Sequence, residues 1–249
     1  PGQWDVNLFE YCGTPKRLLT SGWEEHGQQA ERLTLPDDGM STMAAARRLV
    51  LALRERARSS RRSLVWAALT CIPWCAWQKY NLRTVDEASF RRIDDQRAYS
   101  VKMLNILLWV VRQTRKDKQI GGMVDFAFEW PRWSSGWALE AVTNLRQTLC
   151  YTGEFDGCMY GLQNPKGMAL MKPWRVITTS RALAEALGRR CDRGHERGVA
   201  CGVIAKTSAY YTPRMVEVIG NAVCGADASE ASGPVGTRQS GAAGRVRRS

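Results

Sequence analysis

The sequence predicts an α/β fold, with a mostly parallel β-sheet covered by helices on both faces and an antiparallel strand at one edge. Short apolar runs of strand length alternate along the chain with longer stretches whose apolar residues recur at helical spacing. The last two predicted strands have no clear helix between them, which favours an antiparallel pair, because parallel neighbours need a long crossover connection.

The first third of the chain reads as strand, helix, strand, helix, strand. Residues 5–12 form a short apolar run, and residues 14–27 begin with Thr-Pro and end in Gly, which are signals of a helix start and a helix end. Residues 30–35 form a second short strand. Residues 41–59 begin with Ser and Thr as candidate N-caps and continue in strong helix formers. Residues 63–69 are uninterruptedly apolar, as expected for a strand buried on both faces.

The rest of the predicted domain continues the alternation. The expected elements are a helix at 85–117, a strand at 121–131, a helix at 134–147, strands at 155–162 and 173–180, and helices at 181–190 and 212–223.

Two parts of the chain are expected. Residues 1–224 form one α/β domain, which is enough chain for a sizeable core. Residues 225–249 are rich in Gly, Ala, Ser and Arg and have no apolar periodicity, so we expect a disordered tail or linker. The chain begins without a Met or a leader, and we therefore expect it to be a piece of something longer.

The charge favours an acidic partner. A net charge of +12 and a pI near 9.6 point first to nucleic acid. Part of the excess lies in one predicted helix and its exit, which is either a solvated face or a phosphate-contacting one: Arg47, Arg48, Arg54, Arg56, Arg58, Arg61 and Arg62. The longest apolar run, residues 101–111, is shorter than the ~20 residues of a membrane-spanning helix, so we expect no membrane span. Eight unevenly spaced cysteines suggest reduced thiols and an intracellular setting, with the nucleus as one candidate compartment.

Two predicted strands end in residues that carry chemistry. Cys71 follows the strand at 63–69, and Glu129 lies at the end of the strand at 121–131. In an open α/β sheet, ligands bind beyond the carboxyl ends of the strands. A strand-to-helix turn can favour the Cys71 thiolate, and a Glu129 enclosed by Trp130 and Trp133 would have its pKa raised. A thiol and a proton-holding carboxyl would suit covalent chemistry on an electron-poor ring.

These motifs resemble the DNA cytosine-5 methyltransferases. Residues 70–75 (Thr-Cys-Ile-Pro-Trp-Cys) resemble the family's nucleophile loop, and residues 129–131 (Glu-Trp-Pro) resemble the end of its next catalytic strand. Residues 160–163, followed by 172–175, resemble its later Tyr-Gly and basic pattern, and residues 7–13 resemble its cofactor entry. The motifs occur in the family's order over about residues 5–224.

A divergent group is more similar still. The stretches at 158–162, 172–180, 190–202 and 210–215 resemble methyltransferase-like regions of copia-type retrotransposon polyproteins from protists. That resemblance implies a Rossmann-like S-adenosylmethionine-dependent methyltransferase fold, a nucleic-acid substrate, DNA before RNA, and a place within a polyprotein.

The resemblance also implies roles for individual residues. Cys71 would attack C6 of a flipped-out cytosine, Glu129 would donate to its N3 edge, and Lys172 or Arg175 would hold the base carbonyl or a phosphate. S-adenosylmethionine would lie against residues at the ends of the first and third strands: Phe9, Gly13 and Pro73. The alternative is a catalytically inactive copy that binds nucleic acid.

Other residues leave alternatives open. Asp37 and Asp38 either meet the adenosine part of the cofactor or cap the next helix. Cys191, His195 and Cys201, with Cys158 nearby in the pattern, either bind zinc or are plain thiols beside a capping histidine. Four tryptophans near the strand ends either line a base or cofactor pocket or belong to the core: Trp74, Trp77, Trp133 and Trp137.

Overall fold

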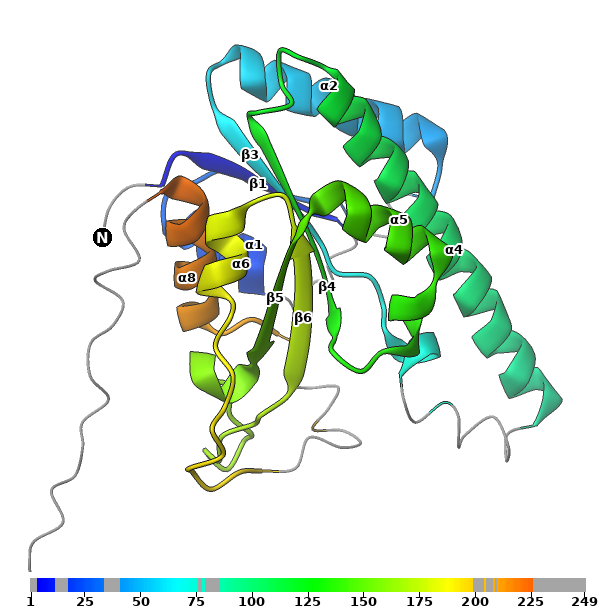
Figure 1. Cartoon of the computed structure of the whole chain (residues 1–249), viewed down its shortest axis with the longest axis vertical. Coiled ribbons are helices and arrows are strands. Elements are labelled where there is room, and N and C mark those ends of the chain that lie inside the picture. The colour runs from blue at the N-terminus through cyan, green and yellow to red at the C-terminus, as the bar shows by residue number, and fades with distance from the viewer. Residues whose placement is uncertain are drawn as a thin grey trace, which may run out of the picture.

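A six-stranded sheet with helices on both faces forms the centre of the molecule (Figure 1). The computed structural model describes residues 4–11, 18–33, 41–75, 78, 86–198, 204, 208 and 210–225. The strands are β1 (Val6–Tyr11), β2 (Ala30–Leu33), β3 (Arg62–Ala67), β4 (Val124–Pro131), β5 (Tyr151–Asp156) and β6 (Pro173–Thr178).

The strand order is β2-β1-β3-β4-β6-β5. Strands β2, β1, β3 and β4 are parallel, and β6 runs antiparallel to both β4 and β5. The mostly parallel sheet with an antiparallel edge is therefore confirmed. The reversed strand, β6, lies one position in from the edge.

Within the described residues, three helices lie on each face of the sheet. Helices α2 (Met43–Arg58), α4 (Glu87–Lys116) and α5 (Glu140–Leu149) cover one face, and α1 (Leu18–Glu25), α6 (Arg181–Ala186) and α8 (Pro213–Cys224) cover the other (Figure 1). Short 3-10 turns follow β3 at Ile72–Trp74, follow β4 at Ser135–Ala138 and follow β5 at Gly157–Tyr160.

The helices begin where a side chain can cap them. Thr42, a predicted cap, accepts a hydrogen bond from the backbone N–H of Ala45. Asp86, Ser180 and Thr212 do the same for α4, α6 and α8. Such caps satisfy amide groups that the helix itself leaves unpaired, so they fix the first residue of each helix.

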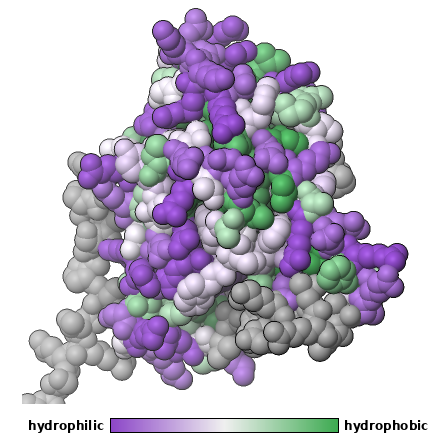
Figure 2. Space-filling model, turned by 45° about the vertical axis from the view of Figure 1, so that its right-hand side comes forward, coloured by the Kyte–Doolittle hydropathy of each residue, from purple (hydrophilic) through white to green (hydrophobic). Residues whose placement is uncertain are grey.

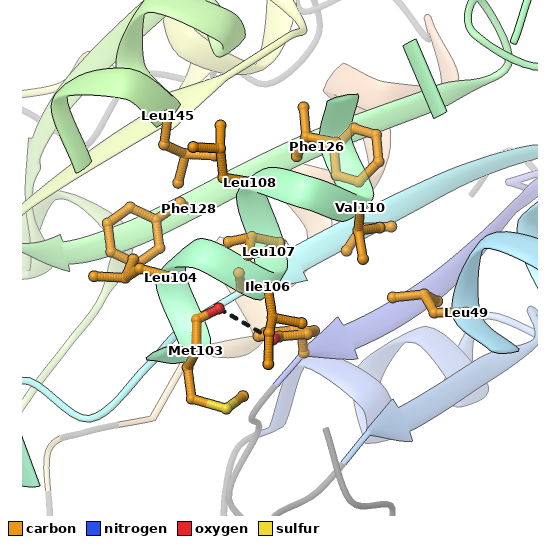
Figure 3. Close-up of a cluster of buried hydrophobic side chains, with 14 of the residues drawn as sticks. Leu49, Met103, Leu104, Ile106, Leu107, Leu108, Val110, Phe126, Phe128 and Leu145 are labelled. Atoms are coloured by element: carbon orange, nitrogen blue, oxygen red, sulfur yellow. Dashed lines mark hydrogen bonds between the residues drawn. The ribbon is translucent and has the colours of Figure 1, made fainter. Parts of the chain in front are cut away.

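Alternation along the strands divides the core into two halves. Phe126, Phe128 and Trp130 of β4 face α2, α4 and α5, whereas Ala127 faces the other side. Figure 3 shows Phe128 beside Leu104 of α4. The Tyr11 hydroxyl donates to the backbone carbonyl of Met103 at 3.3 Å, which satisfies a polar group within this half of the core.

One predicted strand is displaced along the sequence. The expected strand at 155–162 is wrong for most of its length, because β5 ends at Asp156 and a 3-10 turn follows. Cys150 ends α5 with φ +72°, so the chain turns directly into the strand at Tyr151. Gly153 lies close under the backbone carbonyl of Ala184, where a side chain would not fit. The periodicity of residues 155–162 does not show these features.

The ends of the chain lie largely outside the described residues. Gly225 is the C-cap of α8, with φ +74°, which is the left-handed conformation that favours glycine. The expected tail beyond it, residues 226–249, is outside the part of the chain that the structure describes.

The surface is mainly hydrophilic on the face that Figure 2 shows, with hydrophobic side chains visible between hydrophilic ones. Among the described residues, no helix is long and apolar enough to cross a membrane. Even α4, with 30 residues, is rich in charged residues over its first half.

Candidate functional site

The candidate site lies at the carboxyl edge of the sheet, next to the point where the strand order reverses. The chain passes from β1 outward to β2 and then crosses back to β3, so the reversal lies between β1 and β3. In open α/β sheets, a ligand usually binds beyond the carboxyl ends of the strands at such a reversal. Cys71 follows β3, and Glu129 lies two residues before the end of the neighbouring strand β4.

Cys71, Glu129 and Lys172 line one cavity. Its walls come from four separate segments of the chain, and the lining residues are Leu69, Cys71, Glu129, Trp130, Pro131, Lys172, Trp174, Tyr210 and Tyr211. The volume of about 40 Å³ is far below the roughly 300–1,000 Å³ of typical ligand pockets. A ligand as large as a nucleobase therefore enters only if the cavity widens.

The loop that carries Cys71 is held from several sides. Cys71 is half-buried and immediately precedes the 3-10 turn that contains Pro73, so the predicted strand-to-helix turn is a single short turn. The Gln78 side chain donates to the Ile72 carbonyl at 3.0 Å, and Arg97 Nε donates to the Pro73 carbonyl at 3.2 Å. These bonds limit how far the loop can move while Cys71 stays at the cavity.

Glu129 is held by a buried hydrogen-bond chain. It is 4% exposed, and its Oε2 accepts a hydrogen bond of 2.7 Å from the Tyr211 hydroxyl. The same hydroxyl accepts a bond of 2.9 Å from Trp66 Nε1, and the two rings meet edge to face. A buried chain of this kind fixes the orientation of the carboxyl group, because breaking any link leaves a polar group unsatisfied.

The expected enclosure of Glu129 by Trp130 and Trp133 differs from the structure. Trp130 follows Glu129 in the strand and therefore points to the other face, where its Nε1 donates to the Leu69 carbonyl at 2.9 Å. Trp133 is 61% exposed and lies under the Arg132 guanidinium, 4.8 Å from its ring centre. The Tyr211 hydroxyl donates to Glu129 instead, and Trp66 donates to that hydroxyl.

The two basic candidates have different positions. Lys172 lines the cavity, its Nζ donates to the Ser208 carbonyl at 2.9 Å, and it lies 5.2 Å from the centre of the Trp174 ring. Arg175 is not among the lining residues. It forms two hydrogen bonds with Glu154, at 2.9 and 2.6 Å, on the face of the sheet that carries Trp130 of β4.

The residues expected to contact the cofactor are only partly described. Phe9 is 1% exposed and packs in the core with Val65, so it presents almost no surface to a ligand. Pro73 is also buried. Three others, Gly13, Asp37 and Asp38, lie outside the described residues.

Tyr211 is a site residue that the sequence analysis did not single out. Its position is fixed by the helix start that follows, where Thr212 caps α8 and Pro213 occupies the first turn. The sequence does contain one signal, a Tyr directly before a Thr-Pro helix start. That position places the Tyr211 ring at the end of the sheet.

Of the four tryptophans near the strand ends, the three that are described, Trp74, Trp133 and Trp137, do not line the cavity. Trp74 lies under Arg97, and the Trp137 Nε1 donates to the Pro131 carbonyl at 2.8 Å. Trp133 is the exposed one, and Trp77 is outside the described residues. The aromatic residues that do line the cavity are Trp130, Trp174, Tyr210 and Tyr211.

The C-terminal part of the arginine-rich region lies toward the opposite end of strand β3. Arg62 begins β3, whereas Cys71 follows its other end, and a six-residue strand is about 20 Å long. Three of the arginines pair with carboxylates of the protein, Arg54 with Asp117, Arg61 with Asp5 and Arg62 with Asp125. These pairs favour a structural contribution for part of the region.

A second group of reactive side chains lies near the end of β5. The ligand atoms of Cys158, Cys191 and His195 all lie within 4.8 Å of one another. Burial, and then the hydrogen bond and charge of Cys191, raise the pKa of the Cys158 thiol to about 12. Cys201, the fourth residue in the predicted zinc pattern, is outside the described residues.

Comparisons with protein-family models, with curated proteins and with solved structures found no match to this chain.

Proposed function

We propose that this chain is a cytosine-5 methyltransferase-like domain that acts on nucleic acid, with Cys71 as its nucleophile. The observation that carries the proposal is the cavity that Cys71 shares with Glu129 and Lys172. A thiol, a carboxyl group and an ammonium group around one small space are suited to covalent attack on an electron-poor ring. The resemblance in sequence names the same three residues from separate motifs.

Each of these side chains has a role in the proposed reaction. The Cys71 thiolate adds to C6 of cytosine while the Glu129 carboxyl group gives a proton to N3, and C5 becomes a nucleophilic carbon. S-adenosylmethionine would supply the methyl group that C5 takes up. A base then removes the C5 proton, the Cys71 thiolate leaves C6, and N3 returns its proton to the Glu129 carboxylate, which restores the aromatic ring and frees the enzyme.

Tyr211 and Lys172 have separate roles in the proposed site: Tyr211 orients Glu129, and Lys172 contacts the substrate. Tyr211 holds Oε2 of Glu129, so the carboxyl group keeps one orientation as a base arrives. The Lys172 ammonium group has three donors, and the recorded contacts direct it to the Ser208 backbone carbonyl and side-chain oxygen. A base carbonyl or a phosphate oxygen in the widened cavity is a suitable further acceptor.

The assignment of S-adenosylmethionine as the methyl donor is supported by the topology of the sheet and not by individual contacts. Three features of the sheet support the expected Rossmann-like methyltransferase fold: the parallel β2-β1-β3-β4 part, the reversed strand β6 and the reversal of strand order between β1 and β3. The two described residues that were expected to touch the donor, Phe9 and Pro73, are buried. No contact to the donor is therefore assigned to a residue within the described ranges.

The substrate reaches the site as a single extruded base. A base within a duplex cannot contact Cys71, so it must leave the stack at a cost of a few kcal/mol. Trp133 and Arg132 lie just beyond the end of β4, and an exposed tryptophan stacked on an arginine suits a neighbouring unpaired base.

Methyl transfer from labelled S-adenosylmethionine to cytosine-containing DNA and RNA tests the proposal. The wild-type protein should label one of these polymers, Cys71→Ser should abolish the label, and Cys75→Ser should keep it. Cys75 is the matched control, because it is a half-buried thiol at the other end of the same turn and does not line the cavity. Labelling that persists in Cys71→Ser contradicts the assignment of the nucleophile.

The net charge of +12 favours a second candidate, an inactive domain that binds nucleic acid. Its signature is binding that weakens steeply with salt, is unchanged in Cys71→Ser and occurs without methyl transfer by the wild-type protein.

A further inference from the structure

We propose that Cys158, Cys191 and His195 bind a structural zinc ion. The three residues come from two segments, the 3-10 turn after β5 and the loop after α6. Their ligand atoms lie within 4.8 Å of one another, and Cys191 Sγ is 3.2 Å from His195 Nε2. Zinc bonds of 2.0–2.3 Å in a tetrahedron separate ligand atoms by about 3.5–3.8 Å. Small side-chain rotations therefore suffice to bring the three atoms into that geometry.

His195 is oriented as a zinc ligand. Its Nδ1 lies 2.9 Å from the Glu196 carbonyl, and because a carbonyl can only accept, Nδ1 carries the proton. In the neutral ring Nε2 then presents its lone pair to the group that contains Cys191 Sγ. A backbone carbonyl that fixes the other ring nitrogen is the usual outer partner of a metal-bound histidine.

Cys191 is held in place by its surroundings. Its backbone N–H donates to the Asp156 carboxylate at 2.9 Å, and the backbone N–H of Arg193 points to Cys191 Sγ at 3.2 Å. Arg193 adopts φ +70°, a conformation that non-glycine residues seldom take, so the loop turns tightly around the sulfur. A hydrogen bond from a backbone amide stabilises a thiolate that coordinates a metal.

The ligand set selects the metal. Two sulfurs and one imidazole nitrogen favour zinc over magnesium or calcium, which prefer oxygen ligands. Three protein ligands leave one tetrahedral position. The proposal rests on these three, since Cys201 lies outside the described residues.

The position of the ion gives it a structural role near the candidate site. Cys158 belongs to the same short turn as Tyr160, whose backbone carbonyl accepts a hydrogen bond from the Thr212 hydroxyl. Thr212 directly follows Tyr211, which holds Glu129. An ion that joins the turn after β5 to the loop after α6 therefore stabilises the support of Tyr211.

Zinc content of the full chain, measured by mass spectrometry after gel filtration, tests the proposal. We expect about one zinc per wild-type chain, loss of that zinc in Cys191→Ser and His195→Gln, and retention in Cys150→Ser, an exposed thiol outside the group. His195 is also exposed, so His195→Gln should keep the wild-type circular dichroism spectrum while it loses the metal. In Cys191→Ser and His195→Gln, the affinity for zinc, measured against a competing chelator, should fall by more than roughly 10- to 100-fold. A loss of that smaller size is typical when only a hydrogen-bond partner of a metal ligand is removed.

Cobalt gives an independent readout. Co²⁺ added to the metal-free chain should produce the visible bands of a tetrahedral thiolate site, and these should be absent from Cys158→Ser. A zinc-free wild-type chain that also gives no cobalt bands overturns the proposal. So does a His195→Gln variant with wild-type zinc content, or a Cys158–Cys191 disulfide in the chain purified under reducing conditions.

Discussion

Replacing Tyr211 with Phe removes one oxygen atom from the centre of the candidate site and leaves the ring in place. The hydroxyl donates to Glu129 at 2.7 Å and accepts from Trp66 at 2.9 Å, and Tyr211 is only 2% exposed. A typical hydrogen bond contributes about 0.5–1.5 kcal/mol, and leaving a buried donor or acceptor unsatisfied costs about 1–3 kcal/mol. Because the two effects overlap, we expect Tyr211→Phe to lower the free energy of unfolding by roughly 2–4 kcal/mol.

Urea unfolding, followed by tryptophan fluorescence, measures this loss. In a chain of this size the same change lowers the melting temperature by about 5–15 °C. Tyr210→Phe is the matched control, since Tyr210 lines the same cavity and its hydroxyl forms no hydrogen bond within the described part of the chain. It should change stability by less than about 0.5 kcal/mol.

A double-mutant cycle separates the Tyr211–Glu129 bond from other effects. Glu129→Met removes the acceptor and keeps an unbranched side chain of similar length. The two changes should be non-additive by about 1–3 kcal/mol. If Tyr211→Phe costs no more than Tyr210→Phe, or if the cycle is additive, then the hydrogen-bond chain does not hold Glu129 and the argument for its orientation fails.

Two further predictions concern the wall of the cavity and acid stability. Gly136→Ala places a methyl group against the Trp130 ring, so it should cost about 1–3 kcal/mol of stability in urea unfolding and lower methyl transfer; a variant as stable as wild type contradicts this packing. The backbone N–H of Gln119, followed by Arg54, holds the pKa of Asp117 below its ordinary value of 3.8. Because these contacts favour the Asp117 carboxylate, they stabilise the fold above pH 3.8, and the effect is lost as the pH falls through the lowered pKa of the folded state. The stability advantage of wild type over Asp117→Asn should therefore shrink below about pH 4. An advantage that stays constant from about pH 6 to pH 2.5 refutes the assignment.

The sequence predicts the layers of this fold because its apolar patterns are local. The run at 63–69 and the Ser-Thr start at 41–42 become β3 and the cap of α2 nearly where expected. The displaced strand β5 shows the limit of this reasoning. Its start depends on the positive φ of Cys150, and Gly153 is required by the carbonyl of Ala184, a contact between residues distant in sequence.

The candidate site was predictable only in part. Cys71 and Glu129 end adjacent strands, so the parallel sheet brings them to one edge. Lys172 was expected from the resemblance, whereas Tyr211 comes from the start of a distant helix and has no local pattern that predicts its bond to Glu129. The tryptophan after Glu129 was expected beside it, but strand alternation turns it to the opposite face.

Trapping on 5-fluorocytosine tests the central claim most directly. Fluorine at C5 cannot leave as a proton does, so an enzyme that adds its thiolate to C6 and methylates C5 remains bonded to the base. With S-adenosylmethionine and an oligonucleotide that contains 5-fluorocytosine, we expect a denaturation-resistant complex whose cross-linked peptide contains Cys71. The complex should form with Cys75→Ser and should be absent with Cys71→Ser. A wild-type protein that binds the oligonucleotide and forms no covalent complex, or a cross-link to another residue, contradicts the proposed role of Cys71.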